Sequence, residues 1–239
     1  GVGLVVESEG NFVGGKLAFD LGDAAQGMTA SVLAPPPGWA AAAEHAPIAF
    51  AWNLDLRAIA TWLQPCARKV DLLAKLDQYG ARSGRMFLHS IDPDDKSGAG
   101  AAAIDLSDRT YFARQLDQIP MRSKFERSRS FGPYKGKHLS VPFVATVDYV
   151  LDDRVFLLAM GDGVLERATT GAAASAPPVF AFDLLPQGLP VEHWEWLFRQ
   201  AELPAPRRIA ERLQAWQSIH LGARLDGERL VIEARGNRR

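Results

Sequence analysis

A basic segment spanning residues 122–138 contains the residues of this sequence that are best suited to bind a partner molecule. Its sequence, RSKFERSRSFGPYKGKH, sets six cations against one acid, Glu126, and interleaves them with aromatic side chains. Basic side chains pair with acidic or phosphate groups, and aromatic side chains dominate many interfaces. The predicted partner-binding residues are Arg122, Lys124, Arg127, Arg129, Phe131, Tyr134, Lys135 and Lys137.

We interpret this segment as an irregular loop, because the periodicity of the chain stops at Met121 and because Gly132, Pro133 and Gly136 interrupt regular structure. The hypothesis is that the loop docks on an acidic surface of a protein partner. The alternative is a solvated loop whose aromatic side chains hold it against the rest of the protein.

Other spacings in the chain do not support metal, cofactor or catalytic chemistry. The acidic segment at 92–98 has Lys96 at a position where a calcium loop needs an oxygen ligand, and the histidines are scattered. The sequence has no Gly-x-Ser-x-Gly or Ser-x-x-Lys motif, and Cys66 follows a proline between two predicted helices. We therefore expect no cofactor, no metal site and no catalytic residues, and an enzyme of unrecognised type is only the third hypothesis.

Three tryptophans lie close together near the C-terminus. Trp194 and Trp216 fall on the apolar stripes of predicted helices, so we expect both to be buried in the core. Trp196 lies off the stripe and is the aromatic residue that we expect to be exposed.

Length and composition predict a globular protein. The chain has 239 residues, 47% of them hydrophobic, and a formal net charge of −1. A charge this small does not attract nucleic acid to the whole molecule, so we expect no nucleic-acid partner. No apolar run approaches the roughly 20 residues of a membrane span, so a membrane would be reached only through segments absent from this chain.

The stretch 141–163 is the least ambiguous structural element. Alternating apolar residues up to Val150, a turn at 151–154 and an apolar run from Val155 to Met160 predict a long β-hairpin whose second strand lies deeper. The other strand and helix patterns predict an α+β protein with a mostly antiparallel sheet and helices packed on one face.

Two parts of the chain follow the same plan of apolar strand, helix, proline break, helix and hairpin. In this interpretation Phe50-Ala51-Trp52-Asn53-Leu54 corresponds to Phe180-Ala181-Phe182-Asp183-Leu184. The predicted divisions are 1–47, a hairpin and Pro/Ala-rich loop that ends a preceding module; 48–168, a first module; and 169–239, a second module packed with the first. A chance order of elements is the alternative.

Asp108-Arg109-Thr110-Tyr111-Phe112 resembles the Arg-x-Tyr-Phe segment of extracytoplasmic Cache sensor domains. The resemblance implies a pocket for a small ligand that contains Arg109 and Tyr111. A Gly-rich turn and two short strands usually follow this segment in Cache domains, whereas here the basic segment follows.

The strand, helix and hairpin modules, with FVATVDYVLDDRVFLLAMGDGVLER at 143–167 as the best-matching block, resemble an uncharacterised bacterial envelope family encoded near bacterial α2-macroglobulins. This resemblance implies a periplasmic or envelope-associated, non-enzymatic accessory protein with protein partners. A cytoplasmic location is the alternative. A small-ligand-binding sensor domain is the second functional hypothesis.

Overall fold

The computed structural model describes residues 2–9, 11–22, 36–53, 81–95, 97–119, 122–141, 145–171 and 180–238. The strands are β1 (Val2–Glu9), β2 (Phe12–Asp20), β3 (Ile48–Trp52), β4 (Ala81–Asp92), β5 (Ser97–Leu106), β6 (Glu126–Phe131), β7 (Tyr134–Val141), β8 (Ala145–Leu151), β9 (Val155–Met160), β10 (Phe180–Leu184), β11 (Trp216–Asp226) and β12 (Arg229–Arg238). The helices are α1 (Trp39–Ala43), α4 (Thr110–Asp117), α5 (Arg122–Phe125), α6 (Val164–Thr169), the 3₁₀ turn η2 (Pro186–Gly188), α7 (Val191–Gln200) and α8 (Pro206–Leu213).

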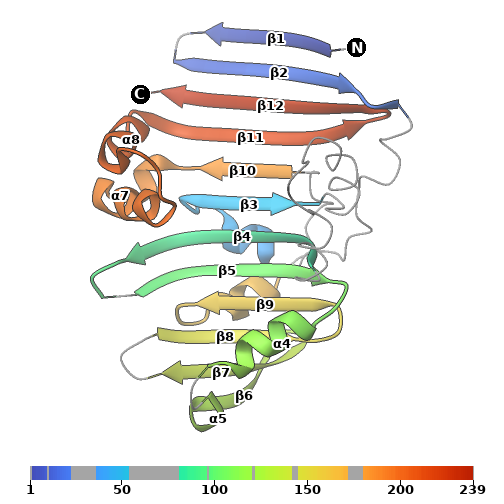
Figure 1. Cartoon of the computed structure of the whole chain (residues 1–239), viewed down its shortest axis with the longest axis vertical. Helices are drawn as coiled ribbons and strands as arrows, with labels where there is room; N and C mark the ends of the chain where they lie inside the picture. Colours follow the sequence, from blue (N-terminus) through green and yellow to red (C-terminus); the bar gives the residue numbers. More distant parts are fainter. Residues whose placement is uncertain are drawn as a thin grey trace.

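These strands form one sheet of 12 strands in the order β1-β2-β12-β11-β10-β3-β4-β5-β9-β8-β7-β6 (Figure 1). Every neighbouring pair is antiparallel. The protein is therefore an α+β protein built on a large antiparallel sheet, as the strand patterns predict. None of the described helices is both long and apolar enough to cross a membrane.

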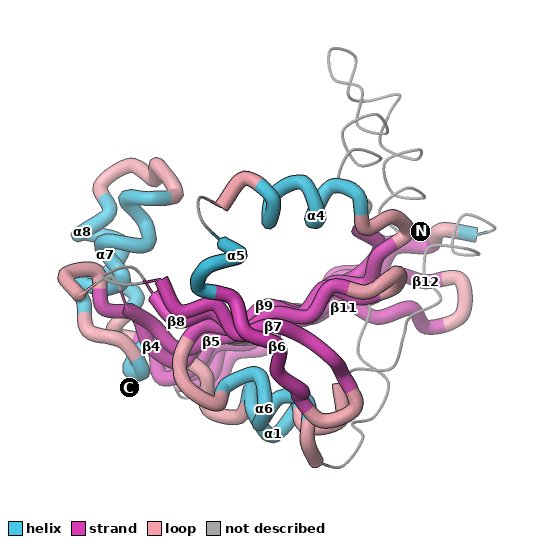
Figure 2. The backbone as a smooth tube through the Cα atoms, turned by 90° about the horizontal axis from the view of Figure 1, so that it is seen from below, coloured by secondary structure: helices cyan, strands magenta, loops and turns pink. Residues whose placement is uncertain are grey.

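Helices lie on both faces of the sheet, so the expectation of helices on one face was wrong. Figure 2 shows α4 and α5 on one side and α1 and α6 on the other. Neighbouring side chains on β9 explain this arrangement, because successive side chains of a strand point to opposite faces. Phe156 contacts Phe112 of α4, with ring centroids 4.6 Å apart, whereas Leu157 is buried in the cluster that contains Leu165 of α6. Since β9 is apolar on both sides, it needs a helical cover on each face.

The long hairpin has its second strand in the deeper position, as predicted. β9 lies between β5 and β8 and is buried along most of its length. The hairpin turn is stabilised by Asp152, whose carboxylate accepts hydrogen bonds from the backbone N–H groups of Arg154 and Val155. β8 is also paired with β7, so the predicted hairpin is part of a longer antiparallel meander.

The basic segment is regular structure, so the prediction of an irregular loop was wrong. Residues 122–125 form α5, and β6 and β7 form a hairpin in which Phe131 pairs with Tyr134 across Gly132 and Pro133. Gly132 has φ +54°, which suits the first central position of a two-residue type II′ turn. Gly132 and Pro133, taken as interruptions of regular structure, therefore make the turn, and Gly136 lies within β7. We call β6 and β7 the edge hairpin.

Of the three tryptophans near the C-terminus, one behaves as expected. Trp194 is buried, and its indole N–H donates a hydrogen bond to the carbonyl of Pro186 over 2.9 Å. Trp216 begins β11 instead of lying on a helix, and it is half-buried under the Arg238 guanidinium at 4.6 Å from the ring centroid. Trp196 is half-buried on α7. The helices predicted between residues 55 and 80, with Cys66, and also Lys96 lie outside the described residues.

Candidate functional site

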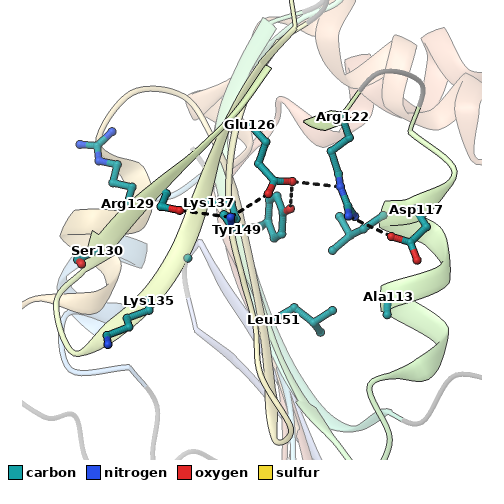
Figure 3. A pocket seen from close by; sticks show the side chains of 13 residues that line it. Ala113, Asp117, Arg122, Glu126, Arg129, Ser130, Lys135, Lys137, Tyr149 and Leu151 are labelled. Atoms are coloured by element: carbon teal, nitrogen blue, oxygen red, sulfur yellow. Dashed lines mark hydrogen bonds and ion pairs between the residues drawn. The ribbon is translucent and has the colours of Figure 1, made fainter. Parts of the chain in front are cut away.

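Glu126 is the centre of the polar network in the basic segment (Figure 3). Its side chain is only 14% exposed, and it accepts a hydrogen bond from the Tyr149 hydroxyl over 2.7 Å. Its carboxylate also pairs with Arg122 Nε at 3.1 Å and with Lys137 Nζ at 3.0 Å. Three elements, α5, β7 and β8, thus direct donors at one carboxylate.

This environment lowers the pKa of Glu126. Burial by itself raises the pKa, but the hydrogen bonds from Tyr149 and Lys137, together with the positive charges of Lys137 and Arg122, outweigh it. The pKa of the Tyr149 hydroxyl is raised, first by burial and then by its hydrogen bond to the Glu126 carboxylate. Glu126 is therefore a charged acceptor and Tyr149 a neutral donor at neutral pH. This protonation pattern is that of a structural ion-pair network and not of an acid/base couple.

Two further ion pairs occupy cations of the basic segment. Arg122 also contacts Asp117 of α4, with 3.0 Å between Nη2 and Oδ1, and Arg129 contacts Glu166 of α6, with 3.1 Å between Nη2 and Oε2. The expectation that six cations face a single acid is therefore wrong in three dimensions, because Asp117 and Glu166 approach from other elements. Within the described ranges, Lys124, Arg127 and Lys135 are exposed and have no ion-pair partner.

The aromatic residues of the segment face inward. Phe131 is fully buried, and Phe125 and Tyr134 pack against apolar clusters on the sheet. They hold the edge hairpin against the sheet, which is the role that aromatic side chains have in the alternative interpretation of the segment as a solvated loop. Phe131 is therefore not available as an anchor for a partner, whereas the cations around it are exposed.

An open groove of about 550 Å³ lies between α4, α5 and the strands β6, β7 and β8. We call it the basic groove. Leu116, Tyr149 and Leu151 supply apolar surface, and the sequence-predicted residues Arg122, Arg129, Lys135 and Lys137 lie around it. Figure 3 shows that Arg122, Lys137 and Tyr149 converge on Glu126, whereas Arg129 and Lys135 point away from this centre.

Sequence reasoning missed Asp117, Tyr149 and Leu151 as parts of this site. Asp117 comes from α4, which precedes the basic segment, and Tyr149 and Leu151 come from β8, which follows it; the fold brings both elements against the segment. One signal was present, because Arg122 and Glu126 are four residues apart, the spacing of a helical ion pair.

Arg109 and Tyr111 do not line the basic groove or the second groove described below. Arg109 is exposed and forms an ion pair of 3.3 Å with Asp153 in the β8–β9 turn. Tyr111 packs edge-on against Phe112, with ring centroids 5.3 Å apart. The ligand pocket that the Cache resemblance implies at this pair of residues stays a prediction.

A second groove, of about 460 Å³, lies between β4, β5, β9 and α7. We call it the apolar groove, because nearly all of the side chains along it are apolar. Met86 and Met160 are 43% and 38% exposed, which is high for large apolar side chains. Trp196, expected to be exposed, contributes to the wall of this groove.

The described residues contain no group of three or more His, Cys, Asp or Glu side chains placed to hold a metal ion. Two His–Asp pairs, His138–Asp148 and His220–Asp183, join neighbouring strands with Nδ1 to Oδ1 distances of 2.7 and 2.6 Å. They are cross-strand contacts.

No known family and no curated protein matches the sequence. Among solved structures, the chain is similar to TP0453 in several crystal forms. The match to crystal form III covers 87% of this chain and 96% of the TP0453 chain, with 9% sequence identity and a TM-score of 0.36. The match to crystal form IV covers 86% of this chain and 94% of the TP0453 chain, with 8% sequence identity and a TM-score of 0.39. A likeness of this strength establishes neither a shared fold nor a shared function.

Proposed function

We propose that this chain is a non-enzymatic binding protein of the cell envelope that docks on an acidic surface of a protein partner through the basic groove and the edge hairpin. The observation that carries the proposal is the set of exposed cations without an ion-pair partner among the described residues, Lys124, Arg127 and Lys135, at one end of the sheet. Each is free to meet an acidic group without first breaking a contact within the protein.

The paired cations support the same proposal in a different way. Arg122 and Lys137 are held by Glu126, which fixes their positions before a partner arrives. Preorganised groups lose less conformational entropy on binding than mobile ones. Complementary charge also speeds the encounter of two proteins.

The location in the envelope rests on the resemblance of the 143–167 block to an envelope family. The proposed mode of binding does not depend on the compartment.

The test begins with a partner purified from the native host, whose affinity is then measured with defined variants. The binding variant carries Lys124→Ser, Arg127→Ser and Lys135→Ser. A matched control carries Arg208→Ser, Arg212→Ser and Arg229→Ser, three exposed arginines outside the site without an ion-pair partner in the described part of the chain. We expect the first variant to lose about fivefold to a hundredfold more affinity than the second, since each of the three exposed charge pairs contributes a few tenths to about 1 kcal/mol. Equal affinities would refute the proposal.

The apolar groove supports a second candidate function, the binding of a small apolar ligand. Its volume lies within the range of about 300–1,000 Å³ that is typical of ligand sites. For the alternative of a small-ligand-binding domain we propose a second location, at Met86, Met160 and Trp196, beside the predicted pair Arg109 and Tyr111.

We also propose that the chain contains two related modules. In support, β3 and β10 are antiparallel neighbours, with Ala51 opposite Ala181. A two-fold axis between these alanines would exchange Trp52 with Phe182. It would also exchange the run β3-β4-β5-β9-β8 with β10-β11-β12-β2-β1. Superposition of the two runs in an experimental structure tests this, and strands that fail to overlap in the same order would refute it.

A further inference from the structure

The outer edge of the sheet at β6 is available for pairing. β6 is the last strand in the order of the sheet, and within the described part of the chain only β7 pairs with it. Figure 1 shows β6 at the lower end of the sheet with no strand beyond it. Residues 127–130 are all exposed. A strand of this kind presents unpaired N–H and C=O groups to an incoming chain.

The register of the edge hairpin identifies which backbone groups face outward. Phe131 and Tyr134 close a two-residue turn, so they form a hydrogen-bonded pair, and such pairs alternate along an antiparallel ladder. Ser128 and Ser130 therefore occupy positions whose N–H and C=O groups point away from β7. Their side chains are small, which leaves room for a neighbouring strand.

Cations flank this edge on both faces of the sheet. On the face of the basic groove, Lys137 lies opposite Ser128 and its ammonium is 3.3 Å from the Ser128 hydroxyl, so the charge lies over β6. Arg127 and Arg129 alternate with Ser128 along β6, so their side chains leave the strand on the other face, where Arg129 reaches Glu166 of α6 although its residue also borders the basic groove. An added strand would have cations beside its side chains on either face.

We propose that the β6 edge receives an extended acidic segment of the protein partner as an additional strand of the sheet. Main-chain hydrogen bonds to Ser128 and Ser130 would provide affinity, and carboxylates beside Lys137, Arg127 and Arg129 would provide selectivity. A second copy of this chain is disfavoured at the same edge, because pairing of two β6 strands brings like charges together. This inference rests on the proposed function and adds the geometry of docking to it.

The first test uses a short fluorescent peptide in which glutamate alternates with valine. Its affinity for the whole chain is measured by fluorescence anisotropy. Two matched peptides serve as controls: one replaces glutamate with lysine, and the other keeps glutamate but carries N-methyl groups on alternate backbone amides. We expect both changes to weaken binding about tenfold or more, because one reverses the charge of the peptide and the other removes main-chain donors. If only the lysine peptide binds more weakly, strand addition is refuted while the proposed function stands. If the glutamate peptide binds no better than the lysine peptide, both are refuted.

The second test blocks the edge on the protein. Ser128→Pro and Ser130→Pro each remove an outward N–H without removing a hydrogen bond to β7. Edge strands tolerate proline at positions of this kind. Ser128→Ala and Ser130→Ala are the matched controls, which remove only a hydroxyl. We expect the proline variants to lose about tenfold in affinity for the glutamate peptide and the alanine variants to keep it. Equal binding by proline and alanine variants contradicts the proposal. If a proline variant fails to fold, the N-methylated peptide, measured with the unmodified protein, still tests strand addition at the β6 edge.

Discussion

Tyr149 on β8 donates a hydrogen bond of 2.7 Å to Glu126 on β6, across the intervening strand β7. These two residues connect strands that are not neighbours in the sheet. Lys137 on β7 and Arg122 on α5 complete the network around the same carboxylate. Together with the buried aromatic side chains of the segment, this acid therefore holds the edge hairpin and its exposed cations in position.

Glu126→Gln should destabilise the protein by about 1–3 kcal/mol, because it weakens hydrogen bonds made to a charged group in a half-buried position. Urea unfolding monitored by circular dichroism measures the change. Glu211→Gln is the control, since Glu211 forms an exposed pair with Arg207 on one helix and should cost less than about 0.5 kcal/mol. A Glu126 variant as stable as the control would show that the network does not hold the hairpin.

The same carboxylate predicts a pH dependence. The folded-state pKa of Glu126 lies below its ordinary value of 4.5, so its contribution is fully present above that value and is lost as the pH falls through the lowered pKa. Between about pH 5 and pH 3 the unmodified protein should lose more stability than Glu126→Gln, as measured by urea unfolding at each pH. Parallel losses in the two proteins would contradict the assignment.

Gly136→Ala should destabilise the edge hairpin. A Cβ atom at this position would lie 2.3 Å from the carbonyl oxygen of Tyr149, a contact that forces the backbone to move. The expected cost is about 1–3 kcal/mol. Gly15→Ala is the matched control in another strand, since its Cβ would approach no atom closer than 3.6 Å. If both substitutions leave the melting temperature unchanged, the packing of β7 on β8 is looser than described.

Ala102→Leu should reduce the binding of an apolar dye such as Nile red. Ala102 lies in the apolar groove with Met86 and Leu158, so a larger side chain there takes up space that a ligand would use. Ala201→Leu, at an exposed position after α7, is the control. Equal dye fluorescence with the two variants would remove the support for a small apolar ligand in this groove.

Sequence patterns predicted the local elements better than the site. The apolar run at 155–160 predicts a deep strand, because a strand apolar on both sides needs cover on both faces, and β9 has it. The basic segment was misread because Gly132 and Pro133 were taken as interruptions instead of a tight turn. The partners of Glu126 could not be predicted, because Tyr149 reaches it only after three strands have paired in register.

The burial of Trp194 followed from helical periodicity, but the position of Trp216 did not. Trp216 continues the apolar spacing of α8 although the helix ends at Leu213 and the chain enters β11. Sequence patterns locate the end of a helix only to within a few residues. Here the long pairing of β11 with β12 includes Trp216 in the sheet.

The central claim is that the exposed cations of α5 and the edge hairpin dock an acidic partner. The most direct test of it is the association rate of the glutamate peptide as a function of salt. Attraction between exposed charges is screened within about 8 Å at physiological ionic strength, so the rate should fall as salt is raised. We expect this fall with the unmodified protein and with the Arg208, Arg212 and Arg229 control. The Lys124, Arg127 and Lys135 variant should associate more slowly at low salt and should depend less on salt. Identical rates and salt dependences for the two triple variants would contradict the claim.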